Sequence, residues 1–105
     1  MGGAYGPKVN NVFSAPDSVT VNNTGGSAEV VEANFDNRRG LILTNTHASK
    51  IIYLGFGQDA VVGKGIVLFP KAIYDMAIND FYGGSIEAIA DSDGATLAIQ
   101  EVVGP

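Results

Sequence analysis

His47 is the only histidine of the chain and the side chain best suited to move a proton near neutral pH. A catalytic histidine needs a nucleophile and an orienting carboxylate held beside it by the fold. His47 stands instead among turn-forming residues, in Asn45-Thr46-His47-Ala48-Ser49-Lys50. The chain has no cysteine, which excludes disulfides, thiolate metal sites and cysteine nucleophiles. We therefore predict a turn residue at His47 and no enzymatic activity.

Three glycine-containing segments could be taken for ligand loops. Asp91-Ser92-Asp93-Gly94 begins like a calcium loop, but the EF-hand pattern needs three acidic or amide positions before its glycine and a helix on each side. Gly55-Phe56-Gly57 and Gly63-Lys64-Gly65 have neither the spacing of a phosphate-binding loop nor a helix to follow. The sequence favours turns at all three, with Phe56 in the core, and predicts no cofactor and no metal.

Basic and aromatic residues are the candidates for contact with a partner. The pair Arg38-Arg39 is either an ordinary surface pair or caps carboxylates across a subunit boundary, since arginine forms bidentate pairs and tolerates desolvation. Phe81 and Tyr82 precede Gly83-Gly84 at a predicted turn, which makes them better interface candidates than aromatics inside strands. Tyr53, Tyr74 or Tyr82 could alternatively stack on sugar rings.

Short segments with period-two patterning and turn residues between them are the elements that would position these side chains. None of the chain has a sustained helical period; even residues 72–80 alternate like a strand. The predicted strands are Val19–Val21, Ala28–Ala33, Leu41–Thr46, Ile51–Phe56, Ile66–Phe69, Ala72–Ile78, Ser85–Ala90 and Thr96–Val103. About eight strands predict an all-β protein, a single small antiparallel β-sandwich that is jelly-roll-like.

Two of the connections suggest direct strand pairing. Residues 41–44 and 51–54 flank a polar turn, and we expect them to form a central antiparallel hairpin. Asp93-Gly94 is a hairpin signal, because glycine accepts a positive φ, so the last two strands should also pair with each other. Both faces of the central strands are fairly apolar, which indicates packing between two layers.

Length and composition limit the class of protein. The 105 residues suffice for one domain with its own core. A net charge of −5, with six basic and eleven acidic residues, argues against nucleic acid as a partner. The chain lacks an apolar run near the ~20 residues of a membrane span and a secretory signal, so we expect a soluble protein made in the cytoplasm. Only 16% of the residues are charged, against roughly 25% in ordinary domains, which suggests a surface covered by neighbours.

Residues 1–18 are predicted to be an extended N-terminal arm, and residues 19–105 the sandwich domain. The arm contains Gly2, Gly3, Gly6, Pro7 and Pro16 and too few apolar residues to fold alone. Two alternatives remain open, a disordered terminus and an arm that pairs with a neighbouring subunit. Exposure of large apolar side chains to water is costly and motivates the second, in which the contact residues are Tyr5, Val12 and Phe13.

Five segments in a fixed order carry a family resemblance: residues 39–45 (RGLILTN), 52–57 (IYLGFG), 66–70 (IVLFP), 82–86 (YGGSI) and 97–102 (LAIQEV). Together, over about residues 36–103, they resemble the small β-sandwich structural proteins of tailed bacteriophages, which serve as capsid cement or decoration proteins and as modules of tails and fibres. The resemblance implies a virion component without enzymatic activity, a trimer or dimer on an assembled shell.

From the resemblance we expect a cement protein on the capsid surface, made in the bacterial cytoplasm, whose partner is the major capsid protein of a phage head. Loop aromatics and the arm would reach across subunit joints, and symmetric repetition would multiply modest contacts. The alternative is a carbohydrate-recognition module of a tail fibre or spike. Neither membrane nor nucleic acid is expected as a partner.

Overall fold

The computed structural model describes residues 11–76 and 82–104. In these residues the regular elements are nine β-strands, and no helix long and apolar enough to cross a membrane occurs among them. The strands are β1 Val12–Phe13, β2 Asp17–Val21, β3 Ala28–Val31, β4 Arg38–Asn45, β5 Ile52–Phe56, β6 Ile66–Leu68, β7 Ile73–Asp75, β8 Ile86–Ala90 and β9 Ala95–Val103.

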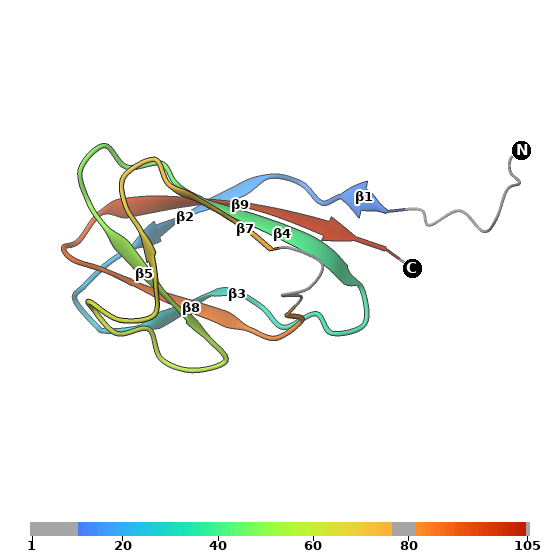
Figure 1. Cartoon of the computed structure of the whole chain (residues 1–105), viewed down its shortest axis with the longest axis horizontal. Coiled ribbons are helices and arrows are strands. Elements are labelled where there is room, and N and C mark those ends of the chain that lie inside the picture. Colours follow the sequence, from blue (N-terminus) through green and yellow to red (C-terminus); the bar gives the residue numbers. More distant parts are fainter. Residues whose placement is uncertain (1–10, 77–81, 105) are drawn as a thin grey trace, which may run out of the picture.

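The strands form two antiparallel sheets that pack face to face (Figure 1). Sheet A, the upper layer in Figure 1, has the order β1-β9-β4-β7, and β2 continues the edge that β1 occupies beside β9. Sheet B, the lower layer, has the order β3-β8-β5-β6. The predicted all-β sandwich is confirmed.

The pairing follows one rule: β2 pairs with β9, β3 with β8, β4 with β7 and β5 with β6. A long eight-stranded hairpin that is rolled up gives this nesting, and it defines the jelly roll. Rolling also places β4 beside β9 and β5 beside β8, which completes both sheets. The jelly-roll expectation is therefore confirmed by the topology.

Alternation along each strand builds the core between the sheets. Leu41, Leu43 and Leu97 from sheet A meet Ile52 and Ile86 from sheet B, and all five are at most 1% exposed. Burial of one such side chain contributes about 1.5–3 kcal/mol. This core fixes the relative position of the two sheets and makes the domain a stiff scaffold.

The predicted central hairpin is wrong, because β4 lies in sheet A and β5 in sheet B. Asn45, the last residue of β4, explains the crossing: its fully buried Nδ2 donates to the carbonyl oxygens of Lys50, at 2.7 Å, and Leu68, at 2.8 Å. Leu68 belongs to β6, so the end of β4 is tied to the opposite sheet. The Asn45 Oδ1 also accepts from the His47 amide, which confirms the predicted side-chain-stabilised turn.

Direct pairing of the last two strands is wrong for the same reason: β8 belongs to sheet B and β9 to sheet A. Gly94 has the expected positive φ of 91°, but its turn carries the chain from one layer to the other. The Asp93 carboxylate accepts hydrogen bonds from the amides of Asn23 and Thr24, so the β8–β9 turn is joined to the β2–β3 turn.

Regular structure begins earlier than the predicted arm boundary at residue 18. Strand β1 pairs Val12 with Val103 and Phe13 with Val102, and β2 starts at Asp17. The part of the arm that precedes Asn11 lies outside the described residues, as do Tyr5, Phe81 and the end of the predicted strand 72–78.

Candidate interaction surface

Arg38, predicted as half of a surface or intersubunit pair, is fully buried, so its prediction as a surface residue is wrong. Its Nε pairs with the Glu101 carboxylate at 2.7 Å. Its Nη1 donates to the carbonyl oxygens of Tyr82 and Gly84, both at 2.9 Å, and its Nη2 donates to that of Glu32 at 2.7 Å. Arg38 therefore joins β4 and β9 of sheet A to the ends of β3 and β8 in sheet B. The carboxylate with which it pairs belongs to the same chain and not to a neighbouring subunit.

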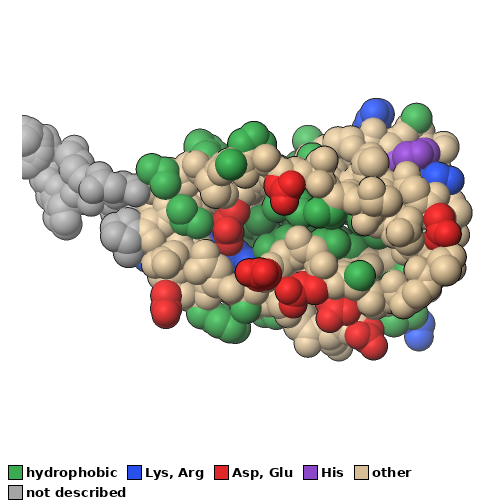
Figure 2. All heavy atoms as spheres, turned by 180° about the vertical axis from the view of Figure 1, so that it is seen from behind, with side chains coloured by type: hydrophobic (Ala, Val, Ile, Leu, Met, Phe, Trp, Pro, Cys, Tyr) green, Lys and Arg blue, Asp and Glu red, His purple; other side chains and the backbone are tan. Residues whose placement is uncertain are grey.

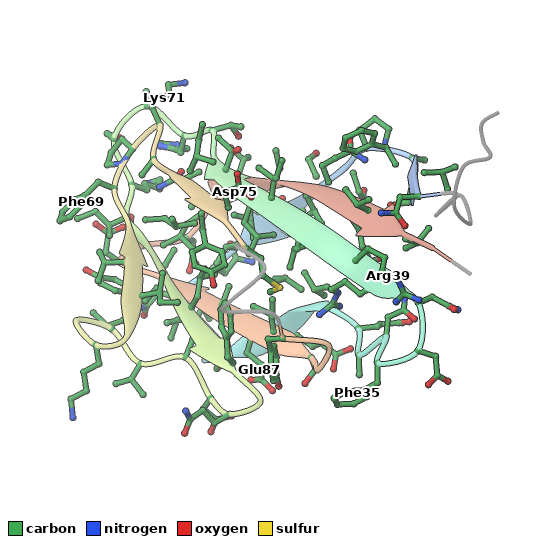
Figure 3. The ribbon with its side chains drawn as sticks, turned by 45° about the vertical axis from the view of Figure 1, so that its right-hand side comes forward. Phe35, Arg39, Phe69, Lys71, Asp75 and Glu87 are labelled. Atoms are coloured by element: carbon green, nitrogen blue, oxygen red, sulfur yellow. The ribbon has the colours of Figure 1, made fainter. Side chains whose placement is uncertain are left out.

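Arg39 differs from its neighbour because its side chain is on the surface, beside the end of the β3–β4 loop (Figure 3). Its guanidinium donates to the carbonyl oxygens of Asp36 and Arg38. The interface prediction for Arg39 is untested, and the residue remains accessible to a partner.

The β1 residues of the predicted interface are on the surface. Val12 is 57% and Phe13 68% exposed, and they pair with the far end of β9. Ser14 continues this contact: its amide and hydroxyl both donate to the Glu101 carbonyl. Two large apolar side chains are therefore exposed to solvent, on a backbone that is hydrogen-bonded to sheet A.

Tyr82, which was predicted as an interface residue, packs against other residues of the same chain. Its ring stacks on Phe56 with 5.3 Å between centroids, and Phe56 meets Tyr74 edge-on at 5.4 Å. The hydroxyl end lies against Gly57 and Gly84, where any Cβ would collide with it. Tyr53, the third tyrosine considered for sugar stacking, is buried under Ala60. All three rings have protein neighbours on at least one side.

The loops considered for chemistry act as turns. His47 Nδ1 accepts from the backbone amides of Ser49 and Lys50, a structural role within the β4–β5 connection. Hydrogen bonds from the Thr24 amide and hydroxyl and the Asn23 amide lower the pKa of Asp93 below its usual value. Among the described residues no group of three histidine or acidic side chains is placed to hold a metal ion.

The outer face of sheet B is covered by the chain itself. The loop between β5 and β6 folds back below this layer (Figure 1) and places Ala60, 5% exposed, over Tyr53 and Ile89. Ser27 pins the loop: its Oγ accepts from the Ala60 amide at 2.8 Å and donates to Glu87 at 2.7 Å. Gly55 permits the fold-back, because a Cβ there would collide with the backbone of the returning loop.

On the outer face of sheet A, no segment among residues 11–76 and 82–104 forms such a cover. We define it by the register, since directly opposed residues of antiparallel strands point to the same side. It consists of Phe13, Ser18 and Thr20 from β1 and β2, Thr96, Ala98, Gln100 and Val102 from β9, Gly40, Ile42 and Thr44 from β4, and Ile73 and Asp75 from β7.

This face is almost free of charge. Its sole charged member, Asp75, lies on the edge strand β7 (Figure 3), while Phe13 at the other edge and Ile73 are 68% and 64% exposed. Figure 2 shows acidic side chains gathered across the middle of the molecule and lower, and hydrophobic and uncharged side chains along the upper border, apart from a basic side chain towards its right. Between the two exposed apolar side chains lies a shallow hollow of about 150 Å³ over Ala98.

The sequence contained part of this surface. Alternate positions share one side of a strand, so the sequence itself groups Ile42 with Thr44, and Ala98 with Gln100 and Val102. That the two strands are neighbours was not predicted, because both had been assigned to other partners. The absence of charge at their outward positions was the signal available in the sequence.

Comparison with known proteins adds no relative: no family model matches the chain, and no curated protein matches it in sequence.

Proposed function

We propose that the chain is a non-enzymatic structural protein of a phage virion, a cement or decoration protein that binds the major capsid protein of the assembled head. The observation that carries the proposal is a stiff jelly roll with large apolar side chains exposed at its two ends. Phe35 is 71% and Phe69 60% exposed, and they point away from opposite ends of the domain (Figure 3).

A protein that reinforces a shell must touch more than one neighbour without deforming between the contacts. The buried core and the Arg38 cross-link supply the stiffness, and the separated contact groups suit a bridge between adjacent capsid subunits. Repetition over a symmetric shell converts modest single contacts into strong stabilisation. Isolated aromatic anchors surrounded by polar surface are typical of such contacts.

The test adds purified protein to expanded shells that lack it and measures binding by sedimentation and the temperature at which the shells rupture. We expect binding and a higher rupture temperature. The variants Phe35→Ser and Phe69→Ser each remove one contact and should bind more weakly and raise the rupture temperature less. A chain that does not sediment with shells, or leaves their rupture temperature unchanged, contradicts the proposal.

A further inference from the structure

We infer that the outer face of sheet A binds a second copy of this chain, with Phe13 of each copy seated in the hollow over Ala98 of the other. This inference concerns self-association and does not depend on the capsid proposal.

The first argument is the contrast with sheet B. A two-layer sandwich exposes two outer faces, and this chain covers the apolar members of one with its own β5–β6 loop. The other keeps Phe13 and Ile73 more than 60% exposed. Exposed large apolar side chains on a weakly charged face are candidate contact points for a partner.

The second argument is shape. The hollow is lined by Ile42, Thr44 and Ala98, by Gln100 and Ile99 of β9, and by Pro16 and Asp17 at its rim. It exists because alanine is the smallest side chain among its neighbours there. Its volume of about 150 Å³ is similar to that of an enclosed cavity that binds benzene, and because this hollow is open to solvent an aromatic ring of a partner can lie against it.

The third argument is geometry. Phe13 pairs with Val102, which follows Ala98 of the hollow by four residues along β9, about 14 Å at ~3.4 Å per residue. A ring and a hollow on the same face of one chain are self-complementary. A two-fold axis that lies between the two copies and crosses β9 near Gln100 places each ring over the other hollow, which makes an isologous dimer.

Charge and area fit a second copy. Two chains of net charge −5 repel each other, and this face carries little of that charge, with Asp75 on an edge strand and Asp17 beside the hollow as its acidic residues. The strands of this face are two to nine residues long, and at ~3.4 Å per residue and ~4.8 Å between strands they cover about 400 Å² in plan, which corrugation by side chains increases. The face therefore suits an interface at the small end of the range, below the ~800 Å² per partner of the standard size.

The experiment exploits the absence of cysteine from the natural chain. In the full-length double variant Phe13→Cys/Ala98→Cys, the two thiols of one copy are too far apart to bond, because a disulfide needs Cα atoms within about 7 Å. Under mild oxidation we expect a covalent dimer on a non-reducing gel. Each single variant should remain monomeric on that gel, and an equal mixture of the two single variants should give the dimer again.

Charge variants provide the second readout, measured by light scattering coupled to size-exclusion chromatography. Ala98→Glu fills the hollow with a charge and should reduce the mass from two chains to one. The control Val62→Glu adds the same charge on the exposed β5–β6 loop and should remain a dimer. Thermal unfolding checks that the variants are folded.

Two results would overturn the inference. The first is a double-cysteine variant that stays monomeric although its thiols react with a soluble reagent. The second is a monomeric natural chain whose binding to shells is abolished by Ala98→Glu, which would assign the face to the capsid and leave the proposed function standing. Failure of shell binding together with a disulfide-linked dimer would instead contradict only the proposed function.

Discussion

The two outer faces of the sandwich both carry apolar side chains, but the described part of the chain covers these side chains on sheet B only. On sheet B, Tyr53 and Ile89 are covered by a loop that returns over them and is pinned by Ser27. On sheet A, Ile42, Ala98 and Val102 form an uncharged surface that the described part of the chain leaves open. The comparison teaches that apolar outward positions alone do not mark an interface; the absence of an internal cover distinguishes the two faces.

Removal of Arg38 should have the largest effect, because both faces depend on the cross-link between the layers. Arg38→Met leaves the Glu101 carboxylate and three carbonyl groups without their donor. Loss of one partner from a buried pair costs about 3–5 kcal/mol, and the 21% exposure of the Glu101 side chain places the expected loss near 3 kcal/mol. Urea denaturation measures it.

The matched control is Arg39→Met, the same substitution one position later on the surface, which should change the free energy of unfolding by less than about 1 kcal/mol. Equal losses in the two variants would mean that Arg38 does not join the layers.

The faces themselves are compared by one truncation on each. Tyr53→Ala empties a covered site on sheet B, where Tyr53 is 9% exposed, and should cost about 3 kcal/mol. Ile42→Ala on the open face of sheet A should cost about 1 kcal/mol or less in the monomer, since that side chain already contacts water. Denaturation of both variants at low protein concentration makes the comparison, and a larger loss for Ile42→Ala would reverse our assignment of the covered face.

The cover can also be loosened without any change to the face beneath it. Ser27→Ala removes the acceptor of the Ala60 amide and should destabilise the domain by about 1 kcal/mol. Faster hydrogen exchange at the Ala60 amide, with unchanged exchange in β4 and β9, would locate the loss to the loop. Unchanged exchange at Ala60 would show that Ser27 does not hold the cover.

The smallest expected effect concerns the pH dependence of stability and does not involve self-association. The pKa of Asp93 is lowered, chiefly by the amide and hydroxyl of Thr24, so its stabilising contribution is present above the ordinary value of 3.8 and is lost as pH falls through the lower folded value. Asp93→Asn should therefore flatten the stability profile below about pH 4. Denaturation between pH 2 and 6, a range that spans the usual pKa of aspartate, measures this change. A profile parallel to that of the natural chain would contradict it.

Strand positions were largely predictable and strand partners were not. The alternation in β4, β5, β8 and β9 is the same whether neighbouring strands pair or cross between layers, because both arrangements bury every second residue. The hydrogen bond that ties the end of β4 to the opposite sheet joins Asn45 to Leu68, more than twenty residues away. The residues of the turn after Asn45 do not indicate this partner.

The candidate site was predictable in the same partial way. Phe13 was identified from its cost in water, whereas Ala98 had no signal of its own, since a small residue becomes a hollow only when its neighbours are in place. Arg38 and Arg39 look alike in sequence. The β-bulge between Arg38 and Gly40 shifts the alternation, so that Arg38 faces inward and Arg39 outward.

The molar mass of the unsubstituted 105-residue chain in solution, followed by light scattering over a dilution series, tests the central claim about the open face most directly. The claim predicts twice the chain mass of 10.9 kDa, which falls towards 10.9 kDa on dilution and is reduced to a single chain by Ala98→Glu at every concentration. A mass of one chain at all concentrations, or a dimer that Ala98→Glu leaves intact, would contradict it.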